Sequence, residues 1–440
     1  MDGAGALTAR GTGYGLGGTG NGGATDGGRR TWDGLPIAGI YFPRTVATFR
    51  YPSAVPRPPC SSVPRPPSPV TRMKVATLFS ALTLAACTVA GAQAIQSEEH
   101  SFHVETVASG LVHPWGIAFL PDGDALVTER PGRVRIIRGG VLQDAPIEGG
   151  PEVRASGQGG LLDIALHPQF AENSYVYMTY SKPGEAGAAT ALARARFDGQ
   201  RLTGLEDIFV ADNWNNRGQH FGSRIVFDGN GMVFISAGER GERDRAQNPG
   251  DHAGTIIRLH DDGRVPQDNP FVRREGFRPE IYSYGHRNPQ GMARHPETGE
   301  LWATEHGARG GDEINLVRPG RNYGWPAITH GINYNGQPIT PDTARAGMEQ
   351  PVLHWTPSIA TSGLTFYTGD AFPNWKGNLF AGALAGQQLR RVVLAGNRVT
   401  HQEVLLEGRA RIRTVKQGPD GAIYLLMDAP DAEVLKLVRE

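Results

Sequence analysis

The stretch SRIVFDGNGMVFISAGE, residues 223–239, places alternating apolar and polar residues on both sides of an Asp-Gly-Asn-Gly turn. Alternation with a period of two predicts two strands, and the turn residues predict that these strands form a hairpin. The same strand-turn-strand pattern recurs along the chain, which indicates that this hairpin is one unit of a repeated structure.

Five further stretches carry the pattern, which makes six units in total. They are WGIAFLPDGDALVTER from Trp115, LLDIALHPQFAENSYVYMTYS from Leu161, PQGMARHPETGELWATEHG from Pro289, SGLTFYTGDAFPNWKGNLFAGAL from Ser362 and RIRTVKQGPDGAIYLLMD from Arg411. Spread over residues 102–440, six units have roughly 56 residues each, which suits a four-stranded blade with its loops.

Additional strand pairs follow some hairpins, such as GRVRIIRGGVL from Gly132 and QLRRVVLAGNRVTHQEVLL from Gln388. Helical periodicity is nearly absent, and the 60 Gly and 32 Pro suit a turn-rich all-β protein. The sequence therefore predicts an all-β fold, a six-bladed β-propeller over residues 102–440, with a pair of β-sandwiches as the alternative. The strand FHVETVA from Phe102 is expected to pair with the C-terminal run EVLKLVR and close the ring.

The first hundred residues differ in character from the repeated units. Residues 1–72 combine a Gly-rich start with a Pro-rich run, so we predict a disordered, spurious extension and a true start at Met73. Residues 73–94 have a Lys, an apolar run and a small-residue end, typical of a secretory signal peptide. We therefore expect a periplasmic or secreted protein. Alternatively, Leu-Ala-Ala-Cys ending at Cys87 resembles a bacterial lipobox, which would place a lipid anchor on that cysteine.

Charge and cysteine content limit the classes of partner. The formal net charge is zero and no basic stripe with interleaved aromatics is present, which argues against nucleic acid. Only Cys60 and Cys87 are present, both ahead of the predicted propeller, so no disulfide is expected within it. Beyond the leader, no apolar run approaches the roughly 20 residues of a membrane helix. Small molecules are the expected partners.

The stretch YGHRNPQGMARHPETGELWATEHGARGGDEINLVRPGRNYGW, residues 284–325, is the richest part of the chain in functional side chains. Its acidic and His residues surround Gly307, Gly310 and Gly311. Glycine permits backbone conformations that turn carbonyls and amides toward an ion or ligand. Taken alone, the stretch is equally well explained as a solvated loop whose charges pair with each other.

Loops in corresponding positions, each ahead of the first strand of a unit, carry polar side chains. In a propeller such loops converge at one mouth of the channel, so these side chains are expected to meet there. Singly, each has a structural explanation, such as a hydrogen-bonded histidine, a turn cap or a solvated strand face. Their joint occurrence in equivalent loops favours a ligand site. The set consists of Gln158, His220, Arg287, Asn288, Arg411 and Arg413.

Four motifs, in their order and spacing, resemble the soluble quinoprotein sugar dehydrogenases, also called glucose/sorbosone or aldose sugar dehydrogenases. They are GQGGLLDIALHP from Gly157, GHRNPQG from Gly285, DEINL from Asp312 with NYGWP from Asn322, and PDGAIYLLMD from Pro419. The resemblance extends from about Val107 to Leu437. It implies a six-bladed propeller, the cofactors pyrroloquinoline quinone (PQQ) and calcium, an aldose substrate oxidised at C1 and an external electron acceptor.

Position by position, the resemblance implies roles for individual residues. It makes His220 the general base. The residues that it places against PQQ are Gln158, Arg287, Asn288, Arg411 and Arg413. The residues that it places at calcium are Gly307 and Ala308, through carbonyls on a cofactor-bound ion, and Glu313 and Tyr323, with Asp312 beside them, on a second, structural ion.

Two positions depart from the family members that oxidise glucose. Gln219 stands before His220 where many of them have an Asp, and Ala385 stands where they have a Lys that faces the cofactor. Both changes remove charged groups that would select one sugar. We therefore expect a broad range of aldoses rather than specificity for glucose.

The chemistry of these side chains agrees with the implied reaction. PQQ is a tricarboxylate o-quinone, and arginines are planar, bidentate donors suited to carboxylates. An imidazole with an ordinary pKa of about 6.5 suits proton abstraction at neutral pH. The alternatives are a calcium-dependent lactonase or esterase of the propeller type and a non-catalytic carbohydrate-binding propeller. Neither accounts for three convergent arginines.

Overall fold

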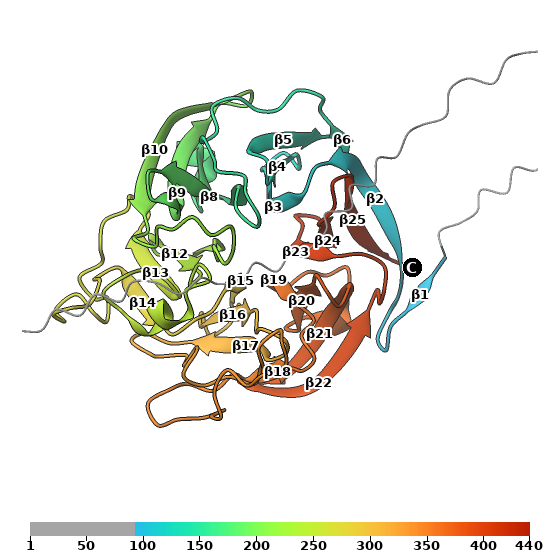
Figure 1. The fold of residues 1–440 in the computed structure, drawn as a ribbon. Helices are drawn as coiled ribbons and strands as arrows, with labels where there is room; N and C mark the ends of the chain where they lie inside the picture. The colour runs from blue at the N-terminus through green and yellow to red at the C-terminus, as the bar shows by residue number, and fades with distance from the viewer. Residues whose placement is uncertain (1–92) are drawn as a thin grey trace, which may run out of the picture. The chain divides into compact units, whose positions relative to one another are not determined.

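The structure, a computed structural model, describes residues 93–440. In this part of the chain the strands form six antiparallel sheets, five with four strands and one with five. Figure 1 shows the sheets arranged as blades around a central channel. The predicted six-bladed β-propeller is therefore confirmed. Within residues 93–440 helical structure is limited to α1 (Phe170–Asn173) and to short 3-10 helices at Arg243–Gln247 and Pro373–Trp375.

Five blades are each built from four consecutive strands, the first of which lies nearest the channel. The first two blades are β3 (Pro114–Phe119), β4 (Ala125–Glu129), β5 (Arg133–Arg138) and β6 (Val141–Leu142), then β7 (Leu161–Leu166), β8 (Tyr175–Gly184), β9 (Gly187–Phe197) and β10 (Leu202–Val210). The next two are β11 (Ile225–Phe227), β12 (Met232–Ala237), β13 (Thr255–His260) and β14 (Ile281–Tyr284), then β15 (Pro289–Arg294), β16 (Leu301–Glu305), β17 (Asp312–Val317) and β18 (Leu353–Trp355). The fifth is β19 (Thr361–Phe366), β20 (Leu379–Ala383), β21 (Gln388–Ala395) and β22 (Arg398–Leu405).

The sixth blade joins the two ends of the propeller. Its strands are β23 (Ile412–Gln417), β24 (Ile423–Met427) and β25 (Ala432–Arg439), then β2 (Ser101–Leu111) and β1 (Ile95–Gln96). The register pairs Phe102 with Arg439, which confirms the predicted closure by the strand at residue 102. Phe102 is fully buried, and its ring packs edge-on against Phe372 and Trp375 of the fifth blade. The short strand β1 extends this sheet slightly ahead of the predicted start.

The hairpin at residues 223–239 illustrates how the sequence directs a blade. Its strands β11 and β12 pair Ile225 with Ile235 and Phe227 with Val233, so apolar residues face the neighbouring blades. Asp228 accepts hydrogen bonds from the N–H groups of Asn230 and Met232, which closes the turn. This side chain-to-backbone bonding explains the choice of Asp at the start of the turn.

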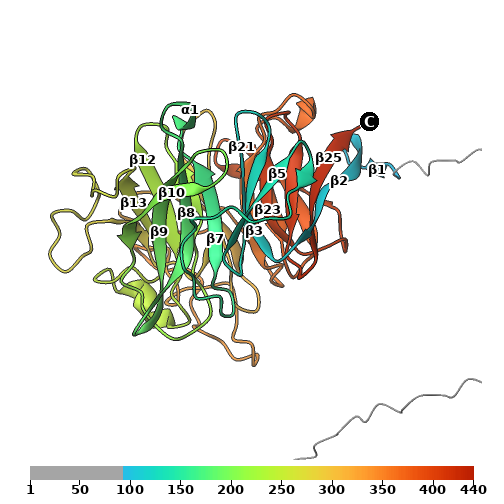
Figure 2. The same ribbon diagram turned by 90° about the horizontal axis from the view of Figure 1, so that it is seen from above.

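The six innermost strands, β3, β7, β11, β15, β19 and β23, all begin at the same end of the channel, which we call the upper mouth, and end at the lower mouth. The second strand of each blade is antiparallel to the first, so it ends at the upper mouth. Figure 2 shows the blades from the side, with loops extending beyond the strands at both ends. Loops ahead of innermost strands therefore gather at the upper mouth, as expected from the sequence.

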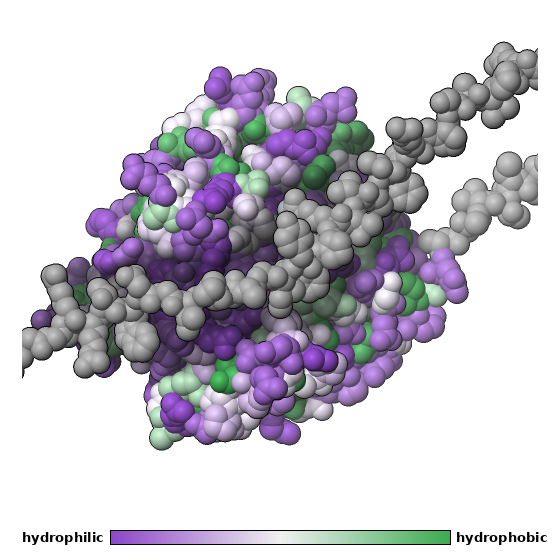
Figure 3. Space-filling view, in the orientation of Figure 1, coloured by the Kyte–Doolittle hydropathy of each residue, from purple (hydrophilic) through white to green (hydrophobic). Residues whose placement is uncertain are grey.

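The face seen in Figure 3 is mostly hydrophilic where it is visible, and apolar residues lie on it in small scattered groups. The predicted extension over residues 1–72, Cys87 and nearly all of the predicted leader over residues 73–94 lie outside the described residues. In the part of the chain that the structure describes, no helix has the length and apolar character needed to cross a membrane.

Candidate functional site

Two cavities of about 260 Å³ and 220 Å³ lie at the upper mouth and share Tyr334 as a lining residue. Five of the six side chains predicted for the base and the cofactor line them: Gln158, Arg411 and Arg413 the first, and His220 and Arg287 the second. The sixth, Asn288, is fully buried and accepts a hydrogen bond from the N–H of Gly222 at 3.0 Å. The structure thus brings all six together across four blades.

His220 is held in a defined orientation at the start of the third blade. Its φ of 53° lies in the left-handed region, which is uncommon for a residue with a side chain. Its N–H donates to Oε1 of Gln158 at 2.8 Å, and its Nδ1 lies 2.9 Å from Oε1 of Glu239. Within residues 93–440 no hydrogen bond is made to its Nε2. A buried imidazole therefore presents one free nitrogen to the cavity.

The protonation of this pair follows from its surroundings. Burial lowers the pKa of His220, the hydrogen bond from Glu239 partly opposes this shift, and the charge of Arg287 adds to it. Burial alone would raise the pKa of Glu239, but the hydrogen bond and charge of His220 lower it. An ionised Glu239 accepts a hydrogen bond from Nδ1–H, which leaves the lone pair on Nε2. This arrangement is that of a general base held by a carboxylate.

Arg240 positions the loop that carries His220, and the sequence prediction missed it. The residue is fully buried, and its guanidinium donates to the carbonyls of Gln219 at 3.0 Å and Ala188 at 2.7 Å, and to that of Arg217 at 2.6 Å. It also lies over the ring of Phe221, with 3.6 Å from Cζ to the ring centroid. Burial lowers its pKa to about 9. No carboxylate among the described residues contacts the guanidinium, so its role is to bind backbone carbonyls.

An acidic residue at or just after the end of the second strand recurs in four blades and was also missed. Each contacts a group of the adjoining loop at the upper mouth, because the second strand ends where the first begins. Glu239 contacts His220, Glu305 contacts Nδ1 of His286 at 2.8 Å, and Asp428 binds arginines. The signal is visible in the aligned units, because an acidic residue ends the second strand or follows it within two positions: Glu129, Glu239, Glu305 and Asp428.

Two arginines of the sixth blade share one carboxylate. Nη2 of Arg413 lies 3.0 Å from Oδ2 of Asp428, and Nη2 of Arg411 lies 3.2 Å from the same oxygen. Arg413 is buried, which lowers its pKa to about 10, whereas the side chain of Arg411 is 47% exposed. The positive charge of Arg413 lowers the pKa of Asp428 well below its usual range, against the effect of burial. Arg413 therefore forms the fixed wall of the cavity and Arg411 its rim.

Four buried nitrogens of the site have no hydrogen-bond partner among the described residues. They are Nε of Arg287, Nδ2 of Asn288, Nε of Arg413 and Nε2 of His306. Buried polar groups in native proteins are nearly always paired, so this cluster has donors available to a ligand. The arginine and amide nitrogens are donors and would bind acceptor oxygens. The cluster fits an anionic, oxygen-rich group such as PQQ.

The loop after β16 carries the residues predicted for the cofactor-bound calcium. A side chain on Gly307 would lie 2.1 Å from the carbonyl oxygen of Gly310, so only glycine fits there. Among the described residues the carbonyl oxygens of Gly307 and Ala308 receive no hydrogen bond. Asp312 holds this loop by accepting from the N–H of Gly307 at 2.8 Å and from the hydroxyl of Ser358 at 2.8 Å and 2.9 Å. The carbonyls suit a hard cation, whereas the oxygens of Asp312 are already used.

Glu313 and Tyr323, predicted for a structural calcium, lie outside the two cavities. Glu313 is paired across the strands with Glu305. Burial and the charge of Glu305 raise the pKa of Glu313 to about 8, which fits a site for a cation between the strands. The hydroxyl of Tyr323 donates to the carbonyl of Leu316 at 2.6 Å, so only its backbone carbonyl is free. Within residues 93–440 no group of three or more His, Cys, Asp or Glu side chains is clustered for metal binding.

The two departures noted in the sequence lie at the edge of the site. Gln219 lines the cavity next to His220 and is exposed. Ala385 is exposed and follows Leu384, which lines the other cavity. Neither position supplies a charge to the site.

Known proteins share both the sequence and the fold. The chain matches the family model for glucose / sorbosone dehydrogenase over residues 111–436. It is 44% identical over 342 residues to aldose sugar dehydrogenase YliI of Escherichia coli (strain K12), across 76% of this chain and 92% of that protein. The crystal structure of the soluble aldose sugar dehydrogenase from Escherichia coli in the apo-form is 44% identical, with a TM-score of 0.75 and coverage of 77% of this chain and 100% of that one.

A relative with a bound cofactor is more distant. The PQQ-bound form of aldose sugar dehydrogenase from Streptomyces coelicolor is 30% identical, with a TM-score of 0.64, and covers 77% of this chain and 98% of that chain. The family match extends into every blade and includes all residues of the upper mouth, so the resemblance seen in the sequence is confirmed. The chain belongs to the glucose/sorbosone dehydrogenase family, whose members are oxidoreductases.

Proposed function

We propose that this protein is a PQQ- and calcium-dependent aldose dehydrogenase that oxidises the C1 hydroxyl of an aldose to the lactone. The observation that carries the proposal is the His220–Glu239 pair, with Nδ1 and Oε1 2.9 Å apart, beside a cluster of buried donors without partners. A base and an empty set of donors in adjoining cavities are what oxidation of a sugar on an anionic quinone requires.

The cofactor would be held by charge and by hydrogen bonds. Arg287, Arg411 and Arg413 supply cations for the carboxylates of PQQ, and Asn288 and Gln158 supply amide groups. The guanidinium of Arg287 lies 5.2 Å from the ring centroid of Trp325, which keeps the arginine in place when no anion is bound. When bound, PQQ supplies a quinone that accepts a hydride, and calcium polarises its carbonyl.

Calcium would be held by backbone oxygens at one site and by a carboxylate at another. The carbonyls of Gly307 and Ala308 are free for a cofactor-bound ion. Oε1 of Glu313, whose Oε2 accepts from Asn315 at 3.0 Å, and the carbonyl of Tyr323 are the groups for a structural ion. Asp312 is better assigned to holding the loop, because Ser358 and the N–H of Gly307 occupy its oxygens.

The protein moves the proton. As hydride leaves C1, the hydroxyl on that carbon must lose its proton, and Nε2 of His220 accepts it. Glu239 stabilises the imidazolium that forms and fixes which nitrogen acts. The pKa of His220 lies below its ordinary value of about 6.5, so the imidazole is neutral and able to act as a base at neutral pH.

Export and electron transfer complete the proposal. We infer a periplasmic or secreted enzyme from the signal-like residues 73–94, with a lipid on Cys87 as the alternative. An external acceptor would take up the electrons of the oxidation at the upper mouth, where the proposed cofactor residues lie. The substrate would be a small aldose, since the departures at Gln219 and Ala385 leave no charge that selects one sugar.

One experiment separates this function from the alternatives. Protein depleted of metal with a chelator is mixed with PQQ, calcium or both, and the absorbance of bound quinone and dye-linked aldose oxidation are measured. We expect activity only with both additions. A propeller lactonase would hydrolyse lactones with calcium alone, and a carbohydrate-binding propeller would bind sugar without turnover. Aldose oxidation that survives exhaustive removal of PQQ would rule out the proposed cofactor.

A further inference from the structure

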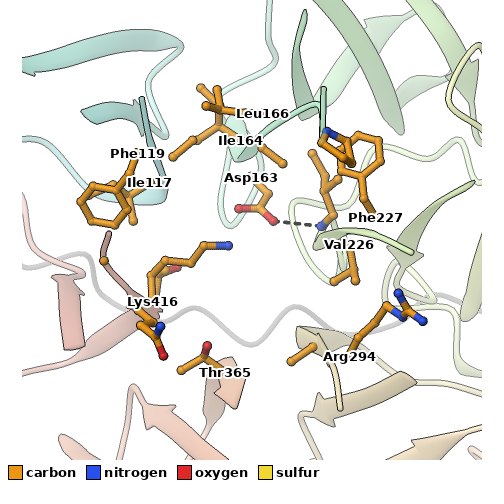
Figure 4. Close-up of a pocket in the computed structure, with 18 of the residues that line it drawn as sticks. Ile117, Phe119, Asp163, Ile164, Leu166, Val226, Phe227, Arg294, Thr365 and Lys416 are labelled. Atoms are coloured by element: carbon orange, nitrogen blue, oxygen red, sulfur yellow. Dashed lines mark hydrogen bonds between the residues drawn. The ribbon is translucent and has the colours of Figure 1, made fainter. Parts of the chain in front are cut away.

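A further cavity lies at the opposite end of the channel from the catalytic groups. It has a volume of about 790 Å³, and the later residues of all six innermost strands line it. We call it the lower chamber. Figure 4 shows its labelled residues arranged around an open centre. Ligand cavities commonly have volumes of about 300–1000 Å³, so the lower chamber is large enough for a small organic molecule.

A buried ion pair lies between the lower chamber and the cavities of the upper mouth. Nη1 of Arg224 lies 2.9 Å from Oδ1 of Asp163, and Oδ2 of Asp163 accepts from the N–H of Ile225 at 2.9 Å. Arg224 also donates from Nε to the carbonyl of Gln290 at 3.1 Å and lies over Trp115, 4.3 Å from the ring centroid. The polar atoms of this layer are satisfied by each other. The layer therefore separates the lower chamber from the cavities of the upper mouth, and its charged groups are all paired with each other.

Lys416 is the charged group of the lower chamber that has no partner. Its side chain is exposed to the chamber, its Nζ makes no hydrogen bond within residues 93–440, and Figure 4 shows it extended into the open centre. The oxygens of Asp163 are already bound by Arg224 and Ile225. At the rim, His167 pairs with Asp261, and Arg294 binds backbone carbonyls. Among the described residues, Lys416 is thus the cation of the chamber whose donors are all free for a ligand, whereas Arg224 is paired with Asp163 and Arg294 is bound to carbonyls.

The walls of the lower chamber are apolar, and its rim is rigid. The walls around Lys416 include the apolar side chains of Ile117, Phe119, Ile164 and Val226. The rim contains Pro121, Pro168, Pro296 and Pro419, each in the turn after an innermost strand. Proline fixes φ, so this rim is rigid before any ligand binds. Burial also lowers the pKa of Lys416, and an anion would offset that penalty.

We propose that the lower chamber binds a small organic monocarboxylate with an apolar body, its carboxylate on Lys416 and its body against the apolar walls. A polyhydroxy acid such as gluconate has the required negative charge but a polar body. Its hydroxyl groups would lose their hydrogen bonds to water without gaining partners on the apolar walls. An inorganic anion has the required negative charge but no apolar surface to bury against the walls of the chamber. The site is distinct from the catalytic cavities and does not depend on the proposed reaction.

Calorimetric titration of the full chain with hexanoate, benzoate, gluconate and sulfate tests the proposal. We expect saturable binding of hexanoate and benzoate, and binding of gluconate and sulfate at least about 10-fold weaker. Lys416→Met should weaken hexanoate binding by about 10- to 150-fold, the range for loss of a charge-assisted contact. Lys416→Arg keeps the charge and should retain binding. Lys436→Met, at a lysine that pairs with Asp420 outside the chamber, is the matched control and should bind as the wild type does.

A second measurement uses the unaltered protein. Reductive methylation followed by mass spectrometry should show Lys416 protected by hexanoate and Lys436 unprotected. Absence of binding by hexanoate and benzoate would overturn the proposal, as would equal binding by the Lys416→Met variant. Sulfate binding as tight as benzoate binding would also overturn it, because the site would then recognise charge alone.

Discussion

Nδ1 of His220 lies 2.9 Å from Oε1 of Glu239, and both residues are buried at the upper mouth. His220 precedes β11 and Glu239 follows β12, and these two strands are antiparallel, so the two residues lie at the same end of one hairpin. The carboxylate both orients the ring and raises the pKa of the imidazole against burial. Glu239 is therefore a positioning residue whose removal should alter the pH dependence of the reaction as well as its rate.

Glu239→Gln should lower kcat by about 10-fold or more, with the base contribution of about 10²- to 10⁴-fold as the upper limit. The negative charge of Glu239 and the hydrogen bond that it accepts raise the pKa of His220, so removal of the charge should lower that pKa. The acid limb of the kcat/KM profile should then move to lower pH, because the base stays neutral further into acid. An acid limb that does not move would show that Glu239 has only a structural role.

His220→Ala should leave PQQ bound, because one ring contributes little to holding a tricarboxylate, and should lower kcat by about 10²-fold or more. Bound quinone is followed by absorbance and turnover by dye reduction. Excess PQQ should not restore turnover. If it did, His220 would be a cofactor ligand or a structural residue, and His286 and His306 would become the candidates for the base.

Arg413→Ala should have the opposite effect. Loss of a charge-assisted contact should raise the dissociation constant for PQQ by about 10- to 150-fold, and saturating PQQ should largely restore activity. Arg411→Ala is the matched control, because this arginine binds the same carboxylate but is 47% exposed. Its effect on the dissociation constant should stay below about 5-fold. Equal effects of the two substitutions would contradict the assignment of Arg413 as the fixed wall.

Arg240→Met should destabilise the propeller by at least about 3 kcal/mol, because it removes the donor for several buried carbonyls at once. Thermal unfolding of the variant measures the loss, and kcat should fall as well, since the same loop carries His220. Arg217→Met is the control for stability, since the side chain of Arg217 is 57% exposed, and it should change unfolding by less than about 0.5 kcal/mol. An unchanged melting temperature for Arg240→Met would show that the carbonyls find other donors.

Phe102→Ala should cost about 3–5 kcal/mol of stability, the usual range for removal of a buried aromatic ring. The ring packs against Phe372 and Trp375, so its loss weakens the junction of the fifth and sixth blades. Val141→Ala, at a position that is 62% exposed, should have little effect. Denaturant unfolding of both variants makes the comparison.

Much of the fold was predictable because local chemistry repeats. Asp228 and its glycines direct a tight turn, and apolar residues alternate on both sides of it. Each blade repeats the pair of strands, although in the second blade α1 replaces the tight turn. The gathering of Gln158, His220 and Arg413 also followed from the repeat, since equivalent loops reach the same mouth. These predictions needed only the order of the units and the direction of their first strands.

The missed residues depend on packing between loops. Arg240 has the character of a surface residue in the sequence, and only the carbonyls of the preceding loop and of Ala188 in β9 explain its full burial. The oxygens of Asp312 are used by Ser358, 46 positions away, a contact that no local pattern indicates. Glu239 is intermediate, because comparison of the ends of the second strands would have found it.

The pairing of β2 with β25 has a consequence for how the domain is made. These strands are the first and last long strands of the propeller, and their register joins Phe102 to Arg439. Contacts between residues so far apart in sequence form late, because a long loop must close before they stabilise anything. Five blades can assemble as the chain leaves the ribosome, but the sixth must wait for the final strand. Until that moment the nascent domain is an open ring with an unpaired edge at each end.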